Sequence, residues 1–551
     1  MFLFFAGLLY AAQAMKLYNV SDSDIPVIQN RGFQEELKND CRRWPESAKV
    51  SNQAYLAGMK CAATVKIIFY TNSSRICFKY SKTRPYIYQH LSHWSMAGFA
   101  LYGVDEDGGH HLCMPNFETN SGNANLNYYG LPEKITEYHV LLSTFDQVTE
   151  LEIGVNDGSH FEYARRMNER PVIMYGTSIM HGACPCHAGN TWANMLHRKL
   201  DFPVYNMGVT GNGKLETDII SFIIKHQARA FVVDCLPNIL GWSDVQSRVY
   251  NAVKQIRAAH PETPIVLVEF GMYGNEVFND RNKNTHINTN KAQKAAYDLL
   301  LEEGVKNMYY VTTEELNYTS DDIVDTLHPL DTGMKKHANA VYKPLATILD
   351  LPNDELTYKT QKAITQYRYL GFRQRHYDLI EKIGQSKPTN VLFGDDIVAH
   401  WEGRSSFPSG YTNFGMNQDR IENVIWRVLH EEMFNYTATK IVLIAGGNNL
   451  ETTTDDNEIV EGLKYLVERV KNKQPNAQII LSGLIPRKGL ESRITTLNGK
   501  IQSMVIAQGK ATYKDLGKSL LSGGSIDSSS YESDGIRLND VGYTKLAAAL
   551  N

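Results

Sequence analysis

The sequence predicts a jelly-roll-like antiparallel β-sandwich followed by two three-layer α/β domains of flavodoxin type with parallel sheets. Three observations predict this multidomain fold. Residues 15–161 contain short runs of β-branched and aromatic residues with turn signals between them. Strand-like apolar runs and helix-like segments then alternate up to residue 351, and the same alternation restarts after residue 352. Such alternation is typical of a parallel sheet with helices on both faces.

Length and composition agree with several folded domains. The chain has 551 residues, of which 43% are hydrophobic, so each domain can bury a core. We expect a sandwich domain over residues 15–165 and α/β domains over 166–351 and 352–551. The net charge of −4 gives no electrostatic reason to expect nucleic-acid binding. We expect no membrane-spanning segment either, because no run of the sequence reaches the necessary length.

Residues 1–14 have the features of a secretory leader. They contain an apolar core and an Ala12-Gln13-Ala14 site, without a Lys or Arg before the core. The segment is too short to span a bilayer, so we interpret it as a signal peptide. This interpretation predicts a periplasmic or secreted bacterial protein. A buried N-terminal strand is the alternative.

The expected strands of the sandwich alternate with turn signals. They lie in residues 60–71, 74–81, 93–109 and 137–145. Four aromatic residues of this region either line a platform for a sugar or belong to the core and to scattered surface positions: Trp94, Tyr102, Tyr128 and Tyr129.

The first α/β domain begins with a buried strand at residues 171–175. Gly176, Thr177 and Ser178 follow it directly, which predicts a tight turn that presents a hydroxyl at the carboxyl edge of the sheet. The later strands are expected at residues 202–207, 229–236, 264–270 and 308–313, with helices at 192–200, 219–227, 242–260, 289–304 and 333–349. A serine in this position can act as a nucleophile if a base and an oxyanion site lie nearby.

Asp325 and His328 supply the candidate base. They are three residues apart, just ahead of the last helix of the domain. A histidine can take the proton of Ser178 during attack on an ester and return it to the leaving alcohol, while a carboxylate holds the imidazole tautomer. His181 and His187 are alternative bases on proximity alone, but neither has such a carboxylate beside it in the sequence.

Gly211 and Asn238 are the candidate oxyanion donors. Gly211 follows the second strand and offers a backbone N–H, and Asn238 follows the third strand and offers a side-chain amide. Taken singly, Gly211 is equally compatible with a helix-entry turn and Asn238 with a helix cap. Glu216, further along, either binds substrate or begins the next helix. Together with Ser178 and His328, the donors indicate an acyl-transfer site.

In order and spacing, these residues resemble the four blocks of the SGNH (GDSL-type) hydrolases. The chain has GTS at residues 176–178 where many members have GDS, and DCLPN at 234–238 where many have GxND. Both forms are similar to those of a bacterial branch with an N-terminal β-domain. Residues 98–108 also resemble the GxDLY motif of that domain, although Ala100 replaces its aspartate.

The resemblance implies a serine esterase that removes acetyl or similar small acyl groups from polysaccharides or oligosaccharides. Its partner would be an acylated glycan, and no cofactor is implied. Two alternatives remain open: a glycan-binding protein without activity, and a lipase or thioesterase of the same fold.

The seven cysteines fit no simple disulfide framework, and their odd number leaves at least one unpaired within the chain. The run Cys184-Pro185-Cys186-His187 suggests a metal site, but a second ligand pair is missing and this spacing is unusual for zinc. We therefore expect no metal. A loop disulfide near Ser178 or plain thiols are the remaining options.

The third domain repeats the strand–helix alternation after a long helix expected at residues 358–384. Its later elements are expected within residues 390–401, 422–429, 439–451, 457–475, 477–489, 511–517 and 533–550. From about residue 375 onward it resembles the catalytic subunits of intracellular platelet-activating-factor acetylhydrolase, which are also SGNH hydrolases. This resemblance implies two diverged copies of one fold.

The second copy departs from the family pattern at its chemistry. Asp396 stands at the nucleophile position, Gln418 at the oxyanion glycine and Arg537 at the histidine, while Asn448 and Asp534 remain. A permanently protonated guanidinium cannot act as a base. We therefore expect a pseudo-hydrolase in which Arg537 pairs with Asp396 or Asp534. Packing, glycan binding or partner binding would be its remaining uses.

Overall fold

The computed structural model describes residues 14–82, 88–117, 123–351, 356–366 and 370–550. The described residues form two compact units. The first contains the residues up to 349 except 106–108, and the second contains 106–108 with the residues from 350 onward. Apart from Ala14, the predicted signal peptide lies outside the described residues. Within the described ranges, no helix is both long and apolar enough to cross a membrane.

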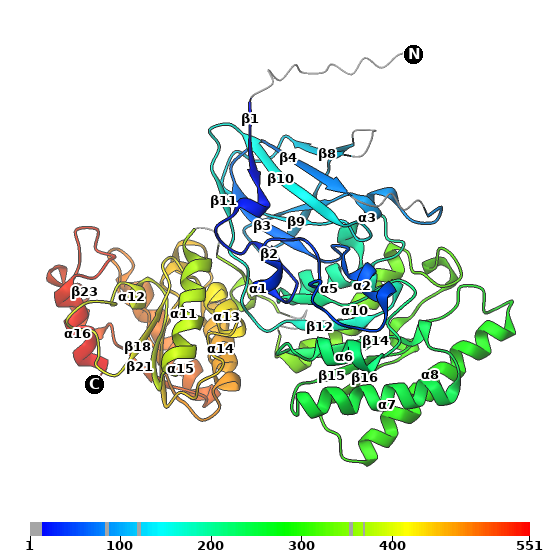
Figure 1. Cartoon of the computed structure of the whole chain (residues 1–551). Helices are drawn as coiled ribbons and strands as arrows, with labels where there is room; N and C mark the ends of the chain where they lie inside the picture. Colours follow the sequence, from blue (N-terminus) through cyan, green and yellow to red (C-terminus); the bar gives the residue numbers. More distant parts are fainter. Residues whose placement is uncertain (1–13, 83–87, 118–122, 352–355, 367–369, 551) are drawn as a thin grey trace. The chain divides into compact units, whose positions relative to one another are not determined.

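The first unit begins with a β-sandwich, as predicted (Figure 1). One antiparallel sheet has the order β1 (Met15–Asn19), β10 (Val148–Asn156), β4 (Arg75–Lys82), β8 (Asn123–Tyr129), β7 (Asn116–Phe117). The other has the order β11 (Phe161–Tyr163), β3 (Lys66–Thr71), β9 (Thr136–Leu141), β5 (Ala100–Val104), β6 (His110–Cys113), and β2 (Ile28–Gln29) pairs with β3. Alternate residues of both sheets form one buried core, including Phe69, Phe78 and Tyr138.

The four aromatic residues of the suggested sugar platform do not share one environment. Tyr102 and Tyr128 are buried, at 5% and 1% exposure, whereas Tyr129 is 50% exposed. Trp94 is partly buried, and its indole N–H donates to the carbonyl of Phe99. Tyr102 and Tyr128 therefore belong to the interior. Ala100, at the GxDLY aspartate position, is fully buried.

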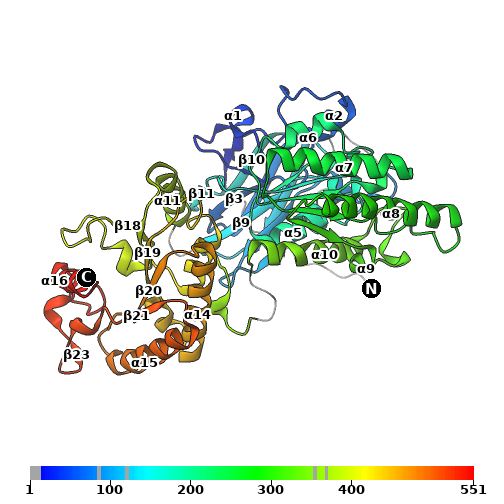
Figure 2. The ribbon, with the colours of Figure 1, turned by 90° about the horizontal axis from the view of Figure 1, so that it is seen from below.

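The rest of the first unit is an α/β domain with a five-stranded parallel sheet, also as predicted. Several of its helices are labelled in Figure 2. The strand order is β13 (Val204–Asn206), β12 (Val172–Gly176), β14 (Ala230–Asp234), β15 (Ile265–Val268), β16 (Met308–Val311). One face packs on α6 (Thr217–Ile223), α7 (Trp242–Ala259) and α8 (Asp280–Glu302). On the other side α5 (Trp192–Leu200) packs against α10 (Asp331–Leu349). This arrangement brings the carboxyl ends of the strands to one edge.

A segment that precedes most of the sandwich strands packs into the α/β core. Trp44, Tyr55 and Met59, the last two from α2 (Gln53–Met59), lie in one buried cluster with residues of β12, β13 and α6. The Tyr55 hydroxyl donates to the carbonyl of Met207 at 2.7 Å. The sequence of residues 15–161 reads mainly as strands. The seven residues of α2 are too short a helical signal to predict that this segment packs against the α/β domain.

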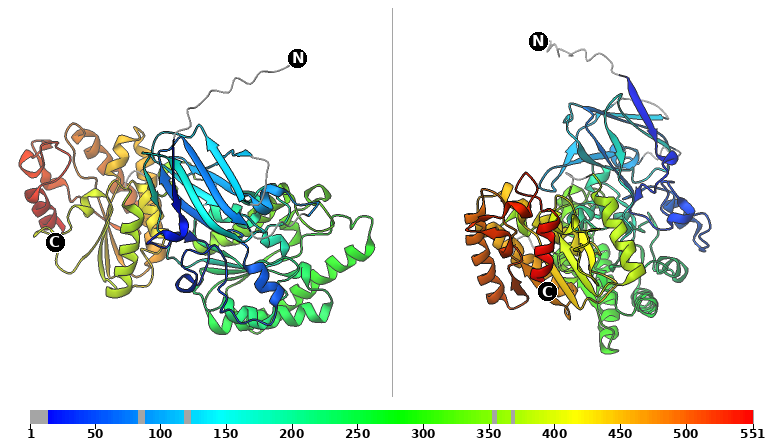
Figure 3. Two further views of the ribbon diagram at one scale, coloured as in Figure 1. Left: turned by 45° about the horizontal axis from the view of Figure 1, so that its top comes forward. Right: turned by 90° about the vertical axis from the view of Figure 1, so that its left-hand side faces the viewer.

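The second unit, yellow-green to red in Figure 3, contains a second parallel sheet. Its strands have the same order as those of the first sheet. Its strands are β18 (Thr412–Gly415), β17 (Asn390–Gly394), β19 (Lys440–Ile444), β20 (Gln478–Ser482) and β21 (Thr512–Lys514). Its longer helices are α11 (Phe372–Ser386), α13 (Ile421–Leu429), α14 (Asp456–Lys473), α15 (Glu491–Gln508) and α16 (Asp540–Leu550). The prediction of two α/β domains with parallel sheets is confirmed.

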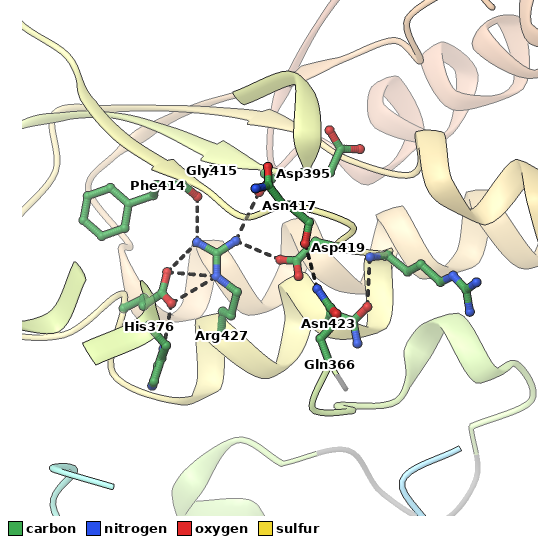
Figure 4. A network of polar contacts seen from close by, with 12 residues as sticks. Gln366, His376, Asp395, Phe414, Gly415, Asn417, Asp419, Asn423 and Arg427 are labelled. Carbon is green, nitrogen blue, oxygen red and sulfur yellow. Dashed lines mark hydrogen bonds and ion pairs between the residues drawn. The ribbon is translucent and has the colours of Figure 1, made fainter. Parts of the chain in front are cut away.

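A buried ion network fixes the turn after β18 in the second unit (Figure 4). Arg427, from α13, forms ion pairs with Asp419 at 2.9 Å and Glu432 at 2.6 Å, and all three side chains are fully buried. Its guanidinium also donates to the carbonyls of Gly394 and Phe414. Burial alone would raise the pKa of Glu432, but the cation of Arg427 lowers that pKa below its usual value. The network ties strand β17 and strand β18 to the turn that carries Gln418.

We expect Arg427→Leu to destabilise the second unit by about 3–5 kcal/mol, because it leaves two buried carboxylates without their cation. Urea unfolding followed by tryptophan fluorescence measures this loss, since Trp401 and Trp426 lie in the core of this unit. Arg537→Leu is the matched control, because its ion pair is exposed to solvent and contributes little. Equal unfolding midpoints for the two variants would contradict a stabilising network.

Candidate active site

Ser178 lies where strand β12 of the first parallel sheet ends. Strand β12 stops at Gly176, Thr177 caps the short helix α4 (Ser178–His181), and Ser178 is its first residue. The backbone N–H of a first helical residue has no partner within the helix. Ser178 is 4% exposed. The hydroxyl and the backbone N–H of Ser178 therefore both lie at the carboxyl edge of the sheet.

His328 and Asp325 meet Ser178 with the geometry of a proton relay. The distance from Ser178 Oγ to His328 Nε2 is 2.7 Å. His328 Nδ1 lies 2.7 Å from Asp325 Oδ2. The other carboxylate oxygen, Oδ1, accepts the backbone N–H groups of Leu327 at 2.6 Å and His328 at 2.7 Å. The three-residue spacing lets one turn hold both ends of the carboxylate, and this orients the imidazole.

The electrostatics of this turn keep Asp325 ionised. Burial alone would raise its pKa, but the hydrogen bonds from His328 and from the backbone N–H groups lower the pKa of Asp325 far below its usual range. An ionised carboxylate accepts the Nδ1–H of His328. Nε2 is then left as the acceptor for the proton of Ser178.

The two predicted oxyanion donors belong to adjacent loops. Gly211 has a φ of +71°, in the left-handed region that favours glycine. Among the described residues, its backbone N–H has no hydrogen-bond partner. The Asn238 amide donates to the carbonyl of Asn212 at 2.5 Å, so it lies beside the Gly211 turn. The carboxyl ends of β13 and β14 thereby bring both donors to the side of the sheet where β12 ends.

The second unit shows where donors in these positions point. Gln418 follows β18 and Asn448 follows β19, as Gly211 follows β13 and Asn238 follows β14. The Gln418 backbone N–H donates to Asp396 Oδ1 at 3.0 Å, and the Asn448 amide donates to Asp396 Oδ2. Two donors that are far apart in sequence thus converge on one carboxylate at the nucleophile position. Convergence of this kind is the geometry that an oxyanion requires.

Asp534 is the partner of Arg537 in the second unit, one of the two that the sequence allowed. Arg537 Nε lies 2.6 Å from Asp534 Oδ2. A cleft of about 280 Å³ opens beside Asp396 and is lined by Arg420, Arg487 and Arg537 among others. Residue 537, at the position that corresponds to His328 in the first unit, is an arginine, although His400 also lines this cleft.

His181 is a structural residue and not an alternative base. It is 2% exposed, its Nε2 lies 2.9 Å from the carbonyl oxygen of Thr144, and its Nδ1 accepts the backbone N–H of Thr210 at 3.2 Å. Burial, together with the cation of Arg43, lowers the pKa of His181 well below its ordinary value. Its two nitrogens join the sandwich to the loop that carries Gly211.

His187 and Glu216 also have local partners. His187 Nδ1 accepts the backbone N–H of Gly189 at 3.1 Å, as the cap of a short 3₁₀ turn. Glu216 precedes helix α6, as expected, and accepts the hydroxyl of Tyr175 at 2.6 Å. Neither residue has a contact with Ser178 or His328 among its described hydrogen bonds.

Two positioning residues were missed by the sequence reasoning. Arg43 is buried and donates to the carbonyls of Asn206 and Gly208, both at 2.9 Å. The Asn52 amide donates to Asn212 Oδ1 at 2.8 Å. Both residues hold the loop of the oxyanion donors from a segment about 160 residues upstream. No local pattern in the sequence marks them.

The cysteines are plain thiols, one of the two options left by the sequence. All seven lie in the described residues, and none forms a disulfide. Cys184 is buried, whereas Cys186 is exposed and its Sγ accepts the side-chain amide of Asn190 at 3.3 Å. The two thiols of the CxC run therefore have different surroundings.

Comparison with known families agrees with this geometry. Residues 169–346 match the GDSL-like lipase/acylhydrolase family, and these residues include Ser178, Asp325 and His328. Residues 15–161 match the GxDLY family, described as the N-terminus of SGNH-hydrolase-type esterases. The chain thus carries an SGNH-hydrolase domain preceded by a GxDLY N-terminal domain.

Several known proteins resemble this SGNH hydrolase. The Drosophila melanogaster platelet-activating factor acetylhydrolase IB subunit beta homolog is 28% identical over 25% of this chain and 63% of its own length. The human IB subunit alpha2 is 32% identical over 22% of this chain and 55% of its own length. The chain thus spans about half to two thirds of these relatives. A crystal structure described as a GDSL-like lipase from Bacteroides ovatus has 22% identity and a TM-score of 0.57, over 61% of this chain and 98% of that one, and it supports the fold.

Proposed function

We propose that this SGNH hydrolase is a serine esterase that removes acetyl or similarly small acyl groups from polysaccharides or oligosaccharides. The observation that carries the proposal is the continuous chain of 2.7 Å contacts from Ser178 Oγ through His328 to Asp325. Periplasmic or secreted location, with residues 1–14 as a signal peptide, is part of the same proposal.

The proposed reaction has two halves. His328 Nε2 takes the proton of Ser178 as Oγ attacks the ester carbonyl, and the developing oxyanion is bound by the N–H groups of Ser178 and Gly211 and the amide of Asn238. Collapse expels the sugar alkoxide, which takes the proton from His328. Water, deprotonated by His328, then attacks the acyl-enzyme. The bond to Ser178 Oγ breaks, Oγ takes the proton back from His328, and acetate is released. Asp325 holds the imidazole and stabilises its cationic form throughout.

The burial of Ser178 supports a small acyl group on a larger molecule. Ser178 is only 4% exposed as a residue, and a narrow substituent reaches such a buried position more readily than a bulky acyl group does. An acetyl group that projects from a sugar hydroxyl has this shape. The GxDLY-type domain that precedes the hydrolase domain supports a polymeric substrate, because it adds a second surface beside the catalytic domain within one unit.

Mass-spectrometric detection of acetate released from a panel of acetylated plant polysaccharides tests the substrate class. We expect release from at least one polymer by the wild-type chain and none above background by Ser178→Ala. Hydrolysis of aryl acetate without release from any polymer would overturn the glycan assignment while leaving the esterase assignment intact.

A longer-chain ester is the second candidate, favoured by exposed apolar residues after two strands of the catalytic sheet. Leu240 and Trp242 follow β14 and are 55% and 47% exposed, and Val277 and Phe278 follow β15 and are 75% and 96% exposed. Exposed apolar residues of this kind are typical of surfaces that bind lipid or acyl chains. A profile of kcat/KM on aryl esters from acetate to octanoate separates the two candidates. We expect the maximum at acetate, and a maximum at octanoate would favour a lipase or thioesterase.

We further propose that the second unit, residues 350–551, is a pseudo-hydrolase. Its support is that the Asp396 carboxylate occupies the position on which Gln418 and Asn448 converge, so no oxyanion can bind there. Arg537, engaged with Asp534, cannot act as a base.

Asp396→Ala is therefore expected to leave kcat/KM for aryl acetate within about twofold of the wild-type value, since every step is assigned to the first unit. Steady-state hydrolysis measured side by side with Ser178→Ala checks this. Loss of activity in Asp396→Ala with retention in Ser178→Ala would reverse the assignment of the two units.

A further inference from the structure

Four side chains with metal-binding atoms surround the outer end of the proposed proton relay. His90, Cys184, Asp325 and His328 each offer one ligand atom, and these atoms all lie within 4.8 Å of one another. His90 belongs to the segment between β4 and helix α3 (His93–Ala97) of the sandwich domain, and Cys184 to the loop after α4. The proposed hydrolysis uses Asp325 and His328, but it gives no role to His90 or Cys184.

The donor set matches the chemistry of zinc. Two imidazoles, one thiolate and one carboxylate are N, S and O donors of the kind that Zn²⁺ binds in tetrahedral sites. Bonds of about 2.0–2.3 Å place such donors roughly 3.3–3.7 Å apart. His90 Nε2 and Asp325 Oδ2 are already 3.7 Å apart. His328 Nδ1 and Asp325 Oδ2, now 2.7 Å apart, would separate slightly when an ion replaces the proton between them.

The surroundings of His90 and Cys184 also suit a site that fills from solvent. The ring of His90 stacks beside that of His328, with 6.2 Å between centroids, and its side chain is 37% exposed. Cys184 is buried and has a φ of +76°, a conformation that a residue with a side chain rarely adopts. Burial, with a contribution from Asp325, raises the pKa of Cys184 to about 12, so the metal-free thiol is protonated.

The neighbouring Cys186 and His187 are not part of this cluster. The Nδ1 atom of His187 accepts the backbone N–H of Gly189. Cys186, which Pro185 separates from Cys184 in the sequence, is exposed. The metal-binding atoms therefore come from three distant segments, which the CxCH run does not indicate. Cys186 thus supplies a matched control for Cys184.

We propose that a thiophilic divalent ion, Zn²⁺ by the chemistry of the donors, binds to His90, Cys184, Asp325 and His328 and switches the esterase off. Binding displaces one proton, from the Cys184 thiol to solvent. If His328 binds through Nδ1, its proton moves to Nε2, which can no longer accept the proton of Ser178. If it binds through Nε2, the same lone pair is occupied by the ion. The inhibition rests on the proposed esterase function, whereas the binding does not.

Direct binding is tested first, without reference to activity. Co²⁺ is added to the full-length wild-type chain as a spectroscopic probe, and thiolate-to-cobalt charge-transfer absorption is recorded. We expect the band to saturate at one equivalent in wild type and Cys186→Ser and to be lost in Cys184→Ser. A band that persists in Cys184→Ser, or no band in wild type, would overturn the site.

Inhibition is tested by titrating Zn²⁺ into aryl acetate hydrolysis and reversing it with EDTA. Each variant is compared with its own metal-free rate. We expect Cys184→Ser and His90→Gln each to raise the half-inhibiting Zn²⁺ concentration at least about tenfold, which is a loss of about 1.4 kcal/mol in binding. Cys186→Ser is expected to match wild type. Unchanged inhibition in both ligand variants would overturn the switch, and a normal cobalt band without any ester hydrolysis would overturn the proposed function alone.

Discussion

Ser178→Ala is expected to lower kcat/KM for aryl acetate by at least about 10⁴-fold, because the variant lacks the atom that forms the acyl-enzyme. His328→Ala is expected to have an effect of similar size, and the double variant hardly more, since the two residues act as a unit. Steady-state hydrolysis measures these losses. Thermal unfolding of each variant controls for folding.

Ser221→Ala is a matched control for this prediction, because Ser221 lies on α6 and its hydroxyl donates to the helix carbonyl of Thr217. We expect wild-type activity from it. If Ser178→Ala kept more than a tenth of the wild-type kcat/KM while remaining folded, the nucleophile would have to be sought elsewhere in the chain.

Asp325→Asn is expected to reduce kcat about 10³–10⁴-fold with little change in fold. Asp325 Oδ1 already accepts two backbone N–H groups, so an asparagine would keep its carbonyl oxygen there and turn its NH₂ group toward His328. That group donates to Nδ1 and forces the imidazole proton onto Nε2. The histidine then holds the wrong tautomer and cannot accept the proton of Ser178.

Asp321→Asn serves as the control, because Asp321 is exposed and lies only four residues upstream. Presteady-state and steady-state rates on aryl acetate compare the two variants at several pH values. A loss smaller than tenfold in Asp325→Asn would show that the carboxylate is not needed to orient His328.

The sequence predicted the parts of this molecule that are encoded locally. Apolar runs followed by Gly-Thr-Ser or by a glycine turn marked the strand ends, so Ser178 and Gly211 could be placed at one sheet edge. The Asp-x-x-His spacing was informative because one short turn holds both Asp325 and His328. Repetition of the same alternation predicted the second parallel sheet.

Contacts between distant segments could not be predicted in this way. Arg43 and Asn52 support the oxyanion loop across about 160 residues, and neither stands in a pattern that signals its role. His90 comes close to Asp325 only through the packing of the sandwich domain on the catalytic domain. In the second unit, the sequence showed that Asp396 and Arg537 depart from the family pattern. It could not show which residues they contact, because those contacts depend on the three-dimensional geometry.

Mass spectrometry after treatment with a fluorophosphonate tests most directly the claim that Ser178, activated by His328, is the ester-cleaving centre of this chain. We expect one adduct per wild-type chain, located on Ser178, and none in His328→Ala. Two results would contradict the account. One is loss of activity that follows an adduct on a residue other than Ser178, and the other is full ester hydrolysis by a chain whose Ser178 is labelled.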